Sequence, residues 1–280
     1  SSSSSSSSSS LPSFFTKLTK ESRERSDKQH HKSIDVTGVV HISCSGLVNE
    51  IDDVYKIVDD YKKMAVCVGV HPHYASRYVE NAPNSREKLL SGEITGDSPV
   101  SELEERIRET MKHKKTVGWG ECGLDYYKNK SSEFEIQKGV FARQIVEAVR
   151  HDKTLVIHCR GDCEKDMLSI LLQHLPPSHP THLHCFSSSL SLLSSLLSSF
   201  PNLHIGLTGN ITYPSPHSTE IITKIPLNRL VLESDGPFLP PVPLSRREVS
   251  HGGLLPYVAD MVADVKGVCV EEVMEKTTEN

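Results

Sequence analysis

The sequence predicts an α/β protein built as a (β/α)8 TIM barrel that lacks its first strand. Short, nearly continuous apolar segments alternate with amphipathic helical segments, which is typical of a parallel sheet covered by helices. Several of these apolar segments are followed by a histidine, a carboxylate or a glycine. Seven such strand-and-helix units follow one another from Val36 onward, one unit short of a closed barrel. The missing unit is expected before Val36, where only a serine tract and a polar segment stand.

The predicted elements follow one another in a regular order. Each helix is recognised by apolar residues spaced three and four apart, as at Ile51, Val54, Tyr55 and Val58. The serine-rich stretch Ser187 to Phe200 keeps this spacing and is therefore predicted to be an amphipathic helix. The predicted strands are 36–43, 64–70, 116–119, 154–157, 182–185, 203–207 and 229–233, and the other helices are placed at 51–58, 101–113, 141–149, 167–175, 217–224 and 254–265.

The composition predicts one catalytic domain. With 280 residues, of which 36% are hydrophobic, the chain can bury one large core. We place this domain at residues 34–280, after a disordered serine tract and polar segment at residues 1–33. The basic stretch from Lys17 to Lys32 is interpreted as a solvated surface rather than a phosphate-contacting arm. The net charge of −5 excludes a polycation, so any contact with nucleic acid must be local.

The seven cysteines are odd in number, and most lie in or just after predicted strands. This pattern favours reduced thiols in a cytoplasmic or nuclear protein. Cys159 and Cys163 have C-x₃-C spacing without a matching pair downstream, which argues against a zinc ribbon. Neither an apolar span of membrane length nor a secretory leader is recognised, so no membrane association is expected.

Four candidate functional residues stand near the ends of predicted strands. Glu121 lies in TVGWGECGLDY, where the strand is expected to open into a loop, and His158, His184 and Asp235 end three later strands. Because barrels of this kind place their chemistry at the carboxyl ends of the strands, we expect the four side chains to converge. Two imidazoles and two carboxylates suit Zn²⁺ or Mn²⁺, and Mg²⁺ less well. Taken singly, each residue also has an ordinary structural interpretation, such as a turn at Asp235.

Five segments, in this order, resemble motifs of the TatD family of metal-dependent deoxyribonucleases, and most closely its eukaryotic members: VGVHPHYA, GWGECGLDYY, LVIHCR, HLHCF and VLESDGPFL. The final VEEVMEKTTEN resembles the closing helix of the family, so the resemblance runs from Val36 to Asn280. It implies a TIM barrel that hydrolyses phosphodiester bonds of DNA, typically as a 3′-5′ exonuclease on single-stranded ends. It also implies a divalent metal cofactor, Mg, Mn or Zn, and no nucleotide cofactor.

The positions of individual residues at the strand ends also suggest roles for them. Asp235 is expected to accept the proton of the attacking water, and His71 to act on the phosphate or the water rather than as a principal ligand. Arg160 and His73 are candidate substrate-binding residues, although an ion pair at the barrel rim for Arg160 and a loop role for His73 remain alternatives. The metal ligands of the family fall on Glu121, His158, His184 and Asp235.

The chain departs from the family at the first strand. Family members carry there an H-x-H pair, usually within a D-x-H-x-H string, that completes a site for two ions, and this sequence has no such string and no H-x-H pair before Val36. His30 and His31 are adjacent, so on a strand they would point to opposite faces. We therefore expect about one ion in place of two. A related amidohydrolase acting on an amide, ester or lactone, and an inactive truncated fragment, remain alternatives to the deoxyribonuclease.

Overall fold

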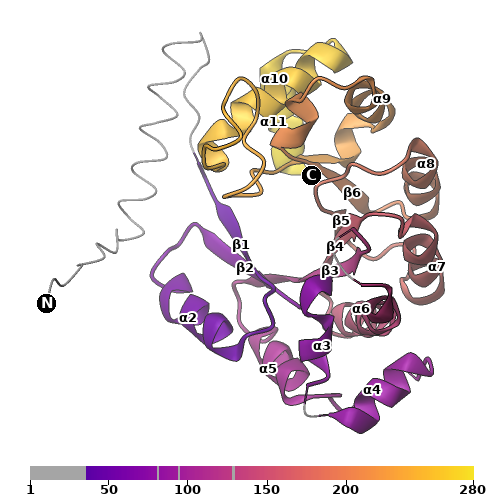
Figure 1. Cartoon of the computed structure of the whole chain (residues 1–280). Helices are drawn as coiled ribbons and strands as arrows, with labels where there is room; N and C mark the ends of the chain where they lie inside the picture. The colour runs from indigo at the N-terminus through magenta and orange to yellow at the C-terminus, as the bar shows by residue number, and fades with distance from the viewer. Residues whose placement is uncertain (1–35, 81, 94, 128–129) are drawn as a thin grey trace, which may run out of the picture.

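The computed structural model describes residues 36–80, 82–93, 95–127 and 130–280. Within them, seven parallel strands form one sheet in chain order, and helices surround it (Figure 1). The sheet is a curled half-barrel, which confirms the predicted α/β fold of the TIM-barrel kind. The strands are β1 (Val39–Ser43), β2 (Met64–Val68), β3 (Thr116–Asp125), β4 (Thr154–Arg160), β5 (Thr181–Leu183), β6 (Leu203–Leu207) and β7 (Leu230–Leu232).

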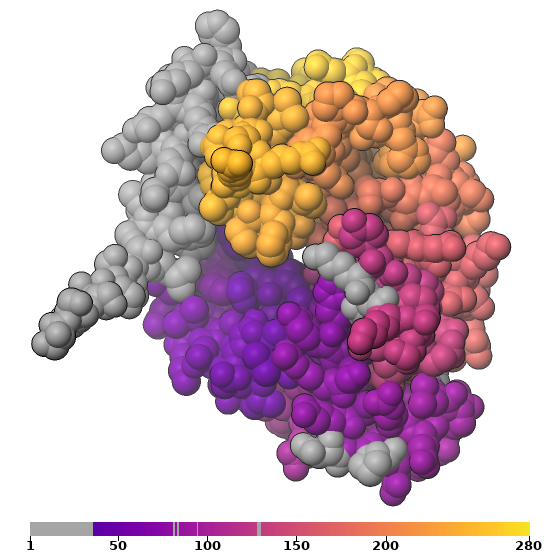
Figure 2. Space-filling view, viewed as in Figure 1, coloured from indigo at the N-terminus to yellow at the C-terminus, as the bar shows by residue number. Residues whose placement is uncertain are grey.

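The sheet curls so that the two halves of the described chain approach each other. In Figures 1 and 2 the orange-yellow segment that follows β7 lies beside the indigo segments around β1 and β2. β1 and β7 are nevertheless the two edges of the described sheet, because neither is hydrogen-bonded to the other. The serine tract, the Lys17 to Lys32 stretch and the His30-His31 pair lie outside the described residues.

Helices follow the strands as predicted, and side-chain caps mark where several of them begin. Ser101 Oγ accepts a hydrogen bond from the Glu104 backbone at 3.2 Å, and Ser189 caps the serine-rich helix in the same way. Two short helices after β2, at Ala75–Tyr78 and Pro83–Leu90, were not predicted. The helices are α2 (Val48–Val58), α3 (Ala75–Tyr78), α4 (Pro83–Leu90), α5 (Glu102–Thr110), α6 (Phe134–Arg150), α7 (Glu164–His174), α8 (Leu190–Ser199), α9 (Pro216–Lys224), α10 (Leu255–Lys266) and α11 (Val270–Glu279), with 3₁₀ turns η1 (Pro72–Tyr74), η2 (Ser131–Glu133), η3 (Gly209–Thr212), η4 (Leu227–Arg229) and η5 (Gly252–Leu254).

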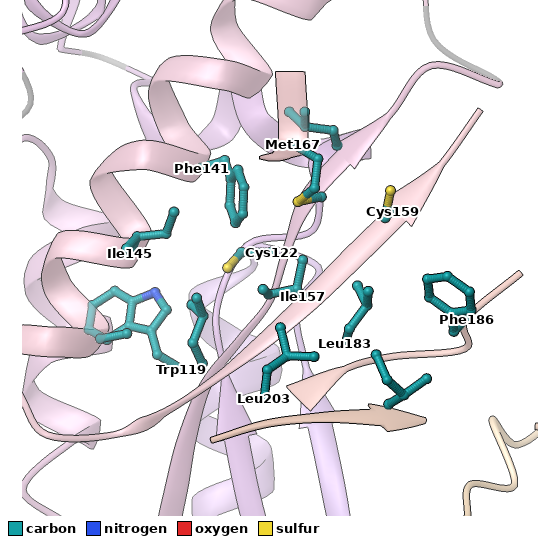
Figure 3. Close-up of a cluster of buried hydrophobic side chains, with 14 of the residues drawn as sticks. Trp119, Cys122, Phe141, Ile145, Ile157, Cys159, Met167, Leu183, Phe186 and Leu203 are labelled. Atoms are coloured by element: carbon teal, nitrogen blue, oxygen red, sulfur yellow. The ribbon is translucent and has the colours of Figure 1, made fainter. Parts of the chain in front are cut away.

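The core lies between the sheet and the helices. Trp119 of β3 and Ile157 of β4 pack in the same cluster as Phe141 and Ile145 of α6, and all four are fully buried (Figure 3). Complete burial of one such side chain stabilises the fold by about 1.5–3 kcal/mol. This packing fixes the strands, and therefore the positions of the polar side chains that they carry.

The third strand is longer than the sequence predicted. Glu121 does not lie where β3 opens into a loop, because the strand continues to Asp125. The pairing of β3 with β4 shifts between Trp119 and Cys122, so Glu121 stands at an irregularity of the kind that re-aims a side chain. Gly120 makes this irregularity possible: its φ is +144°, and a Cβ there would lie 2.4 Å from the carbonyl oxygen of Val156.

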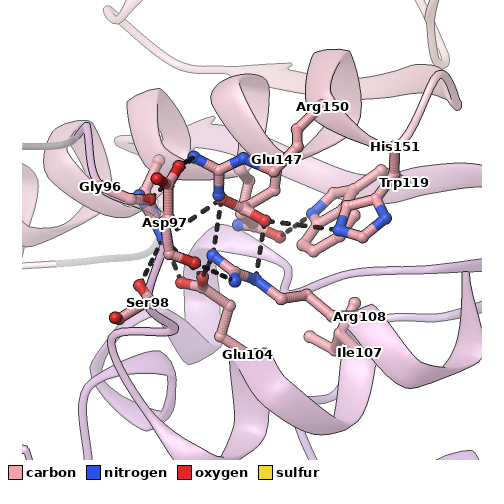
Figure 4. Close-up of polar contacts among 12 residues, drawn as sticks. Gly96, Asp97, Ser98, Glu104, Ile107, Arg108, Trp119, Glu147, Arg150 and His151 are labelled. Carbon is pink, nitrogen blue, oxygen red and sulfur yellow. Dashed lines mark hydrogen bonds and ion pairs between the residues drawn. The ribbon is translucent and has the colours of Figure 1, made fainter.

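A buried ionic network joins α5 to α6, on the outside of the sheet (Figure 4). Arg143 of α6 donates to Glu104 of α5 at 2.7 Å, and both side chains are almost completely buried. Arg108 bridges the helices, at 2.6 Å from Glu104 and 2.8 Å from Glu147. Each buried charge in this network therefore has an opposite charge beside it.

Two further expectations concern thiols and membranes. All seven cysteines are free thiols, and Cys159 Sγ lies 3.6 Å from Cys163 Sγ. Among the described helices, none combines the length and the apolar character that crossing a membrane requires.

Candidate metal centre

A carboxylate oxygen of Glu121 lies among three histidine rings at the carboxyl edge of the sheet. Its Oε1 is 2.7 Å from Nδ1 of His158, 3.8 Å from Nε2 of His184 and 3.9 Å from Nε2 of His71. Asp235 joins this cluster through Oδ1, which is 3.5 Å from Nε2 of His184. The structure thus brings together the four residues predicted as metal ligands, with His71 beside them.

The donor atoms fit a divalent cation. Two groups of three have ligand atoms that all lie within 4.8 Å of one another: His71 with Glu121 and His158, and His184 with Cys185 and Asp235. Protein ligands bind Zn²⁺ at about 2.0–2.2 Å from nitrogen or oxygen, so atoms separated by up to about 4 Å can share one ion. Burial raises the pKa of the Cys185 thiol to about 12, so this side chain is protonated at neutral pH and is the weakest candidate of the set.

Two carboxylates that were not predicted, the fully buried Asp125 and the mostly buried Glu233, hold the histidine rings from behind. Asp125 Oδ2 lies 3.2 Å from Nε2 of His158, and Glu233 is hydrogen-bonded to Nδ1 of His184. Glu233 also accepts a hydrogen bond from the Cys185 backbone at 3.1 Å. A signal for both was present in the sequence, because side chains two or four residues apart on an extended segment share a face: Asp125 follows Glu121 by four, and Glu233 precedes Asp235 by two.

A glycine of β6 makes room for one of these carboxylates. A Cβ at Gly206 would lie 1.5 Å from Oε1 of Glu233 and 2.5 Å from Nε2 of His182. These separations are far below any van der Waals contact, so a side chain at this position would displace Glu233. Gly206 is therefore part of what allows Glu233 to reach His184.

The charges of the cluster compensate one another. Burial disfavours the charged forms of His158 and His184, but the neighbouring carboxylates outweigh it and raise the pKa values to about 9 and about 10. Burial also opposes ionisation of Glu121, yet its hydrogen bond with His158 and the nearby imidazoles lower its pKa to about 2. Burial raises the pKa of Asp235 to about 6, and burial lowers that of His71 to about 3. Without a metal, His158 and His184 are therefore both protonated at neutral pH.

The remaining predicted residues lie around this cluster. His71 accepts a hydrogen bond from the His73 backbone at its Nδ1, at 3.1 Å, so the proton of the neutral ring is on Nε2, which faces Glu121. The ring of His73 approaches Asp125 instead, with Nε2 2.9 Å from Oδ2. The guanidinium of Arg160 lies over the ring of Tyr127, 4.5 Å from its centroid.

A curled parallel sheet whose carboxyl edge carries histidines and carboxylates at ligand distances is typical of metal-dependent hydrolases with a TIM-barrel fold. The family model described as TatD related DNase matches residues 14–280, and the chain belongs to this family.

Curated relatives agree with this assignment. The chain is 34% identical over 201 residues to the 3′-5′ RNA nuclease TATDN2 of Homo sapiens, a match that covers 71% of this chain and 24% of that protein. It is 31% identical over 217 residues to the 3′-5′ ssDNA/RNA exonuclease TatD of Erwinia amylovora, covering 76% of this chain and 74% of the relative. The chain thus spans about a quarter of the human relative and about three quarters of the bacterial one.

Solved structures show the same fold. The TatD homologue YJJV of Escherichia coli superposes with a TM-score of 0.70 at 20% identity, over 93% of this chain and 89% of that chain. A TatD family hydrolase of Entamoeba histolytica gives a TM-score of 0.69 at 17% identity, over 95% of this chain and 87% of that chain.

Proposed function

We propose that this chain is a metal-dependent nuclease that removes nucleotides from the 3′ ends of single-stranded nucleic acid, DNA or RNA. The observation that carries the proposal is the position of Glu121 Oε1, 2.7–3.9 Å from three histidine nitrogens at the carboxyl edge of the sheet. Membership of the TatD related DNase family supports phosphodiester bonds as the target. One relative is named as an RNA nuclease and another as an ssDNA/RNA exonuclease, which supports single-stranded DNA or RNA as the substrate.

We assign the metal to Glu121, His158, His184 and Asp235. Their mixed nitrogen and oxygen donors suit Zn²⁺ or Mn²⁺ better than Mg²⁺. When bound, the ion supplies Lewis-acid chemistry: it lowers the pKa of water and polarises a phosphoryl oxygen.

The other side chains supply proton transfer and orientation. Asp235 is only partly buried and stands beside His184, so its carboxylate is placed to accept the proton of the attacking water. His71 presents a protonated Nε2 to the site, and we assign it to donate a hydrogen bond to the phosphate. Nδ1 of His71 accepts a backbone hydrogen bond, so its Nε2 could bind a metal only if this bond were lost, which supports this role over that of a ligand.

The test uses oligonucleotides labelled at either end. Single-stranded DNA and RNA of one sequence are incubated with protein loaded with Mn²⁺ or Zn²⁺, and the products are sized over time. Stepwise shortening of a 5′-labelled strand, abolished by EDTA, is the expected result. Hydrolysis of small amides or esters with intact oligonucleotides would support the amidohydrolase instead, and absence of any hydrolysis by metal-loaded protein would contradict the proposal.

A further inference from the structure

Three arginine–tyrosine stacks occur in the described part of the chain, and all of them lie at the carboxyl edge of the sheet. Each pairs a guanidinium with a tyrosine ring at 4.4–4.5 Å from the ring centroid. The tyrosines follow the ends of β2, β3 and β6. The pairs are Arg77 with Tyr74, Arg160 with Tyr127, and Arg246 with Tyr213.

The location of these stacks is more informative than their number. Contacts of this kind occur about once per 70–80 residues, so three are ordinary for a chain of this length. In a parallel sheet, however, segments that follow strands share the edge at which the strands end, and the candidate metal centre lies at the same edge. Two stacks are directly connected to it: the ring of Tyr74 lies 6.3 Å from that of His71, and the Tyr127 backbone donates to Oδ1 of Asp125 at 2.9 Å.

One of the three stacks is open to solvent on both partners. Tyr127 is 68% exposed although it is a large aromatic residue, and Arg160 is exposed as well. The other two stacks are tied to the protein: Arg77 donates to the Ser45 carbonyl at 2.5 Å, and the Tyr213 hydroxyl donates to that of Pro240 at 3.1 Å. Tyr127 and Arg160 are therefore the pair with the most surface left for a ligand.

We propose that Tyr127 and Arg160 form a stacking platform for a nucleobase of the substrate strand, next to the metal centre. An exposed tyrosine ring offers a π-face to any base, and the arginine beside it adds a positive charge for the adjacent phosphate. A planar guanidinium stacks on the ring while it carries this charge, whereas an ammonium group carries the charge but has no planar face to stack. This inference rests on the proposed function, because it states how the same site holds its strand. It also meets the condition set by the overall charge of −5, which requires contacts with nucleic acid to be local.

The experiment compares a strand with bases to a strand without them. Binding of a fluorescent oligo-dT and of an abasic strand of equal length is measured by anisotropy, in EDTA so that the strands stay intact. The variants are Tyr127→Ala, Tyr127→Phe, Arg160→Ala and Arg160→Lys. Lys112→Ala serves as the control for loss of an exposed positive charge, because Lys112 is exposed and lies before β3, at the opposite edge.

Tyr127→Ala should weaken binding of oligo-dT about 5- to 150-fold, the range measured for base–aromatic stacking, and should leave the abasic strand bound as before. Tyr127→Phe should bind oligo-dT like the unchanged protein. Arg160→Ala should weaken binding of both strands and make the affinity less dependent on salt. Arg160→Lys should restore the affinity for the abasic strand but not that for oligo-dT. Lys112→Ala should leave the affinity for both strands unchanged.

Three results would overturn the platform. They are unchanged binding of oligo-dT by Tyr127→Ala, an equal loss for both strands in that variant, or an unmodified protein that binds both strands alike. The nuclease assay described above is independent of these measurements. Hydrolysis without an effect of Tyr127→Ala would refute the platform alone, whereas base-dependent binding without hydrolysis would refute the nuclease alone.

Discussion

Asp125 holds His158 by the ring nitrogen that faces away from Glu121. Its Oδ2 lies 3.2 Å from Nε2, while Nδ1 of the same ring lies 2.7 Å from Glu121. Glu233 holds His184 by the other nitrogen, Nδ1, so that Nε2 faces Glu121 and Asp235. A neutral imidazole carries one N–H group. When this group donates a hydrogen bond to a carboxylate, the opposite nitrogen is free to bind a metal. We therefore expect each carboxylate to select the nitrogen through which one histidine binds the proposed metal.

Replacing Asp125 tests this selection. We expect Asp125→Ala to weaken metal binding about 10- to 100-fold, the usual effect of removing a carboxylate behind a ligand histidine. Asp125→Asn should bind metal more tightly than Asp125→Ala, because the amide oxygen can accept the same hydrogen bond from His158. Calorimetric titration with Mn²⁺ or Zn²⁺ gives the affinities. Asp53→Ala, on the exposed face of α2, is the control, and equal affinities for Asp125→Ala and this control would refute the role.

Glu233 should keep its position beside His184 only while position 206 is a glycine. In Gly206→Ala the new Cβ takes the space of the Glu233 carboxylate, so both thermal stability and metal affinity should fall. Gly252→Ala is a matched control, since a Cβ there meets nothing within 4 Å. Calorimetric titration and thermal melting of the two variants make the comparison. If Gly206→Ala binds metal as tightly as Gly252→Ala, the packing of Glu233 does not govern the site.

Metal affinity should rise with pH. Before metal binds, His158 and His184 have pKa values of about 9 and about 10, so each nitrogen must lose a proton at neutral pH. The affinity should increase up to about tenfold per pH unit for each proton displaced, and the increase should end as the pH passes these pKa values. Titrations at neutral pH in two buffers of different ionisation enthalpy count the protons released, and about two are expected. Metal binding without proton release would show that the rings are neutral beforehand.

The buried network between α5 and α6 should be essential for stability. Glu104→Gln leaves the guanidinium of Arg143 buried without its main partner, which costs about 3–5 kcal/mol. The pair of Asp52 and Arg106 is a suitable contrast because it lies at the surface, and Asp52→Asn should cost only about 0–1 kcal/mol. Urea denaturation of both variants measures the difference. Equal costs for the two substitutions would contradict the importance of burial.

Local patterns were sufficient to predict the helices that pack on the sheet and the strands between them. The spacing of Leu193, Leu196 and Phe200 predicted α8 despite its serines, because apolar periodicity outweighs composition. α4 escaped prediction because Leu89 is the one residue of this polar helix that is buried in the described core. The helix depends on neighbours that the local sequence does not reveal.

The site was predicted less completely than the fold. Residues at strand ends could be grouped because parallel strands end at one edge, but the position of Glu121 inside β3 depends on a shift in pairing with β4. Asp125 and Glu233 act through contacts with His158 and His184 on other strands. Contacts between strands of this kind depend on the register of the sheet and on its irregularity at Glu121, which the local patterns of the sequence do not reveal.

The most direct test of the central claim is the metal content of Glu121→Gln, measured by elemental analysis beside its rate on a single-stranded oligonucleotide. Glutamine keeps the shape of the side chain but removes the charge that lies 2.7–3.9 Å from three histidine nitrogens. The unmodified chain should hold a divalent ion and shorten the strand, and Glu121→Gln should lose both the ion and the activity. A Glu121→Gln protein that keeps its metal and its full rate would contradict the assignment of this centre.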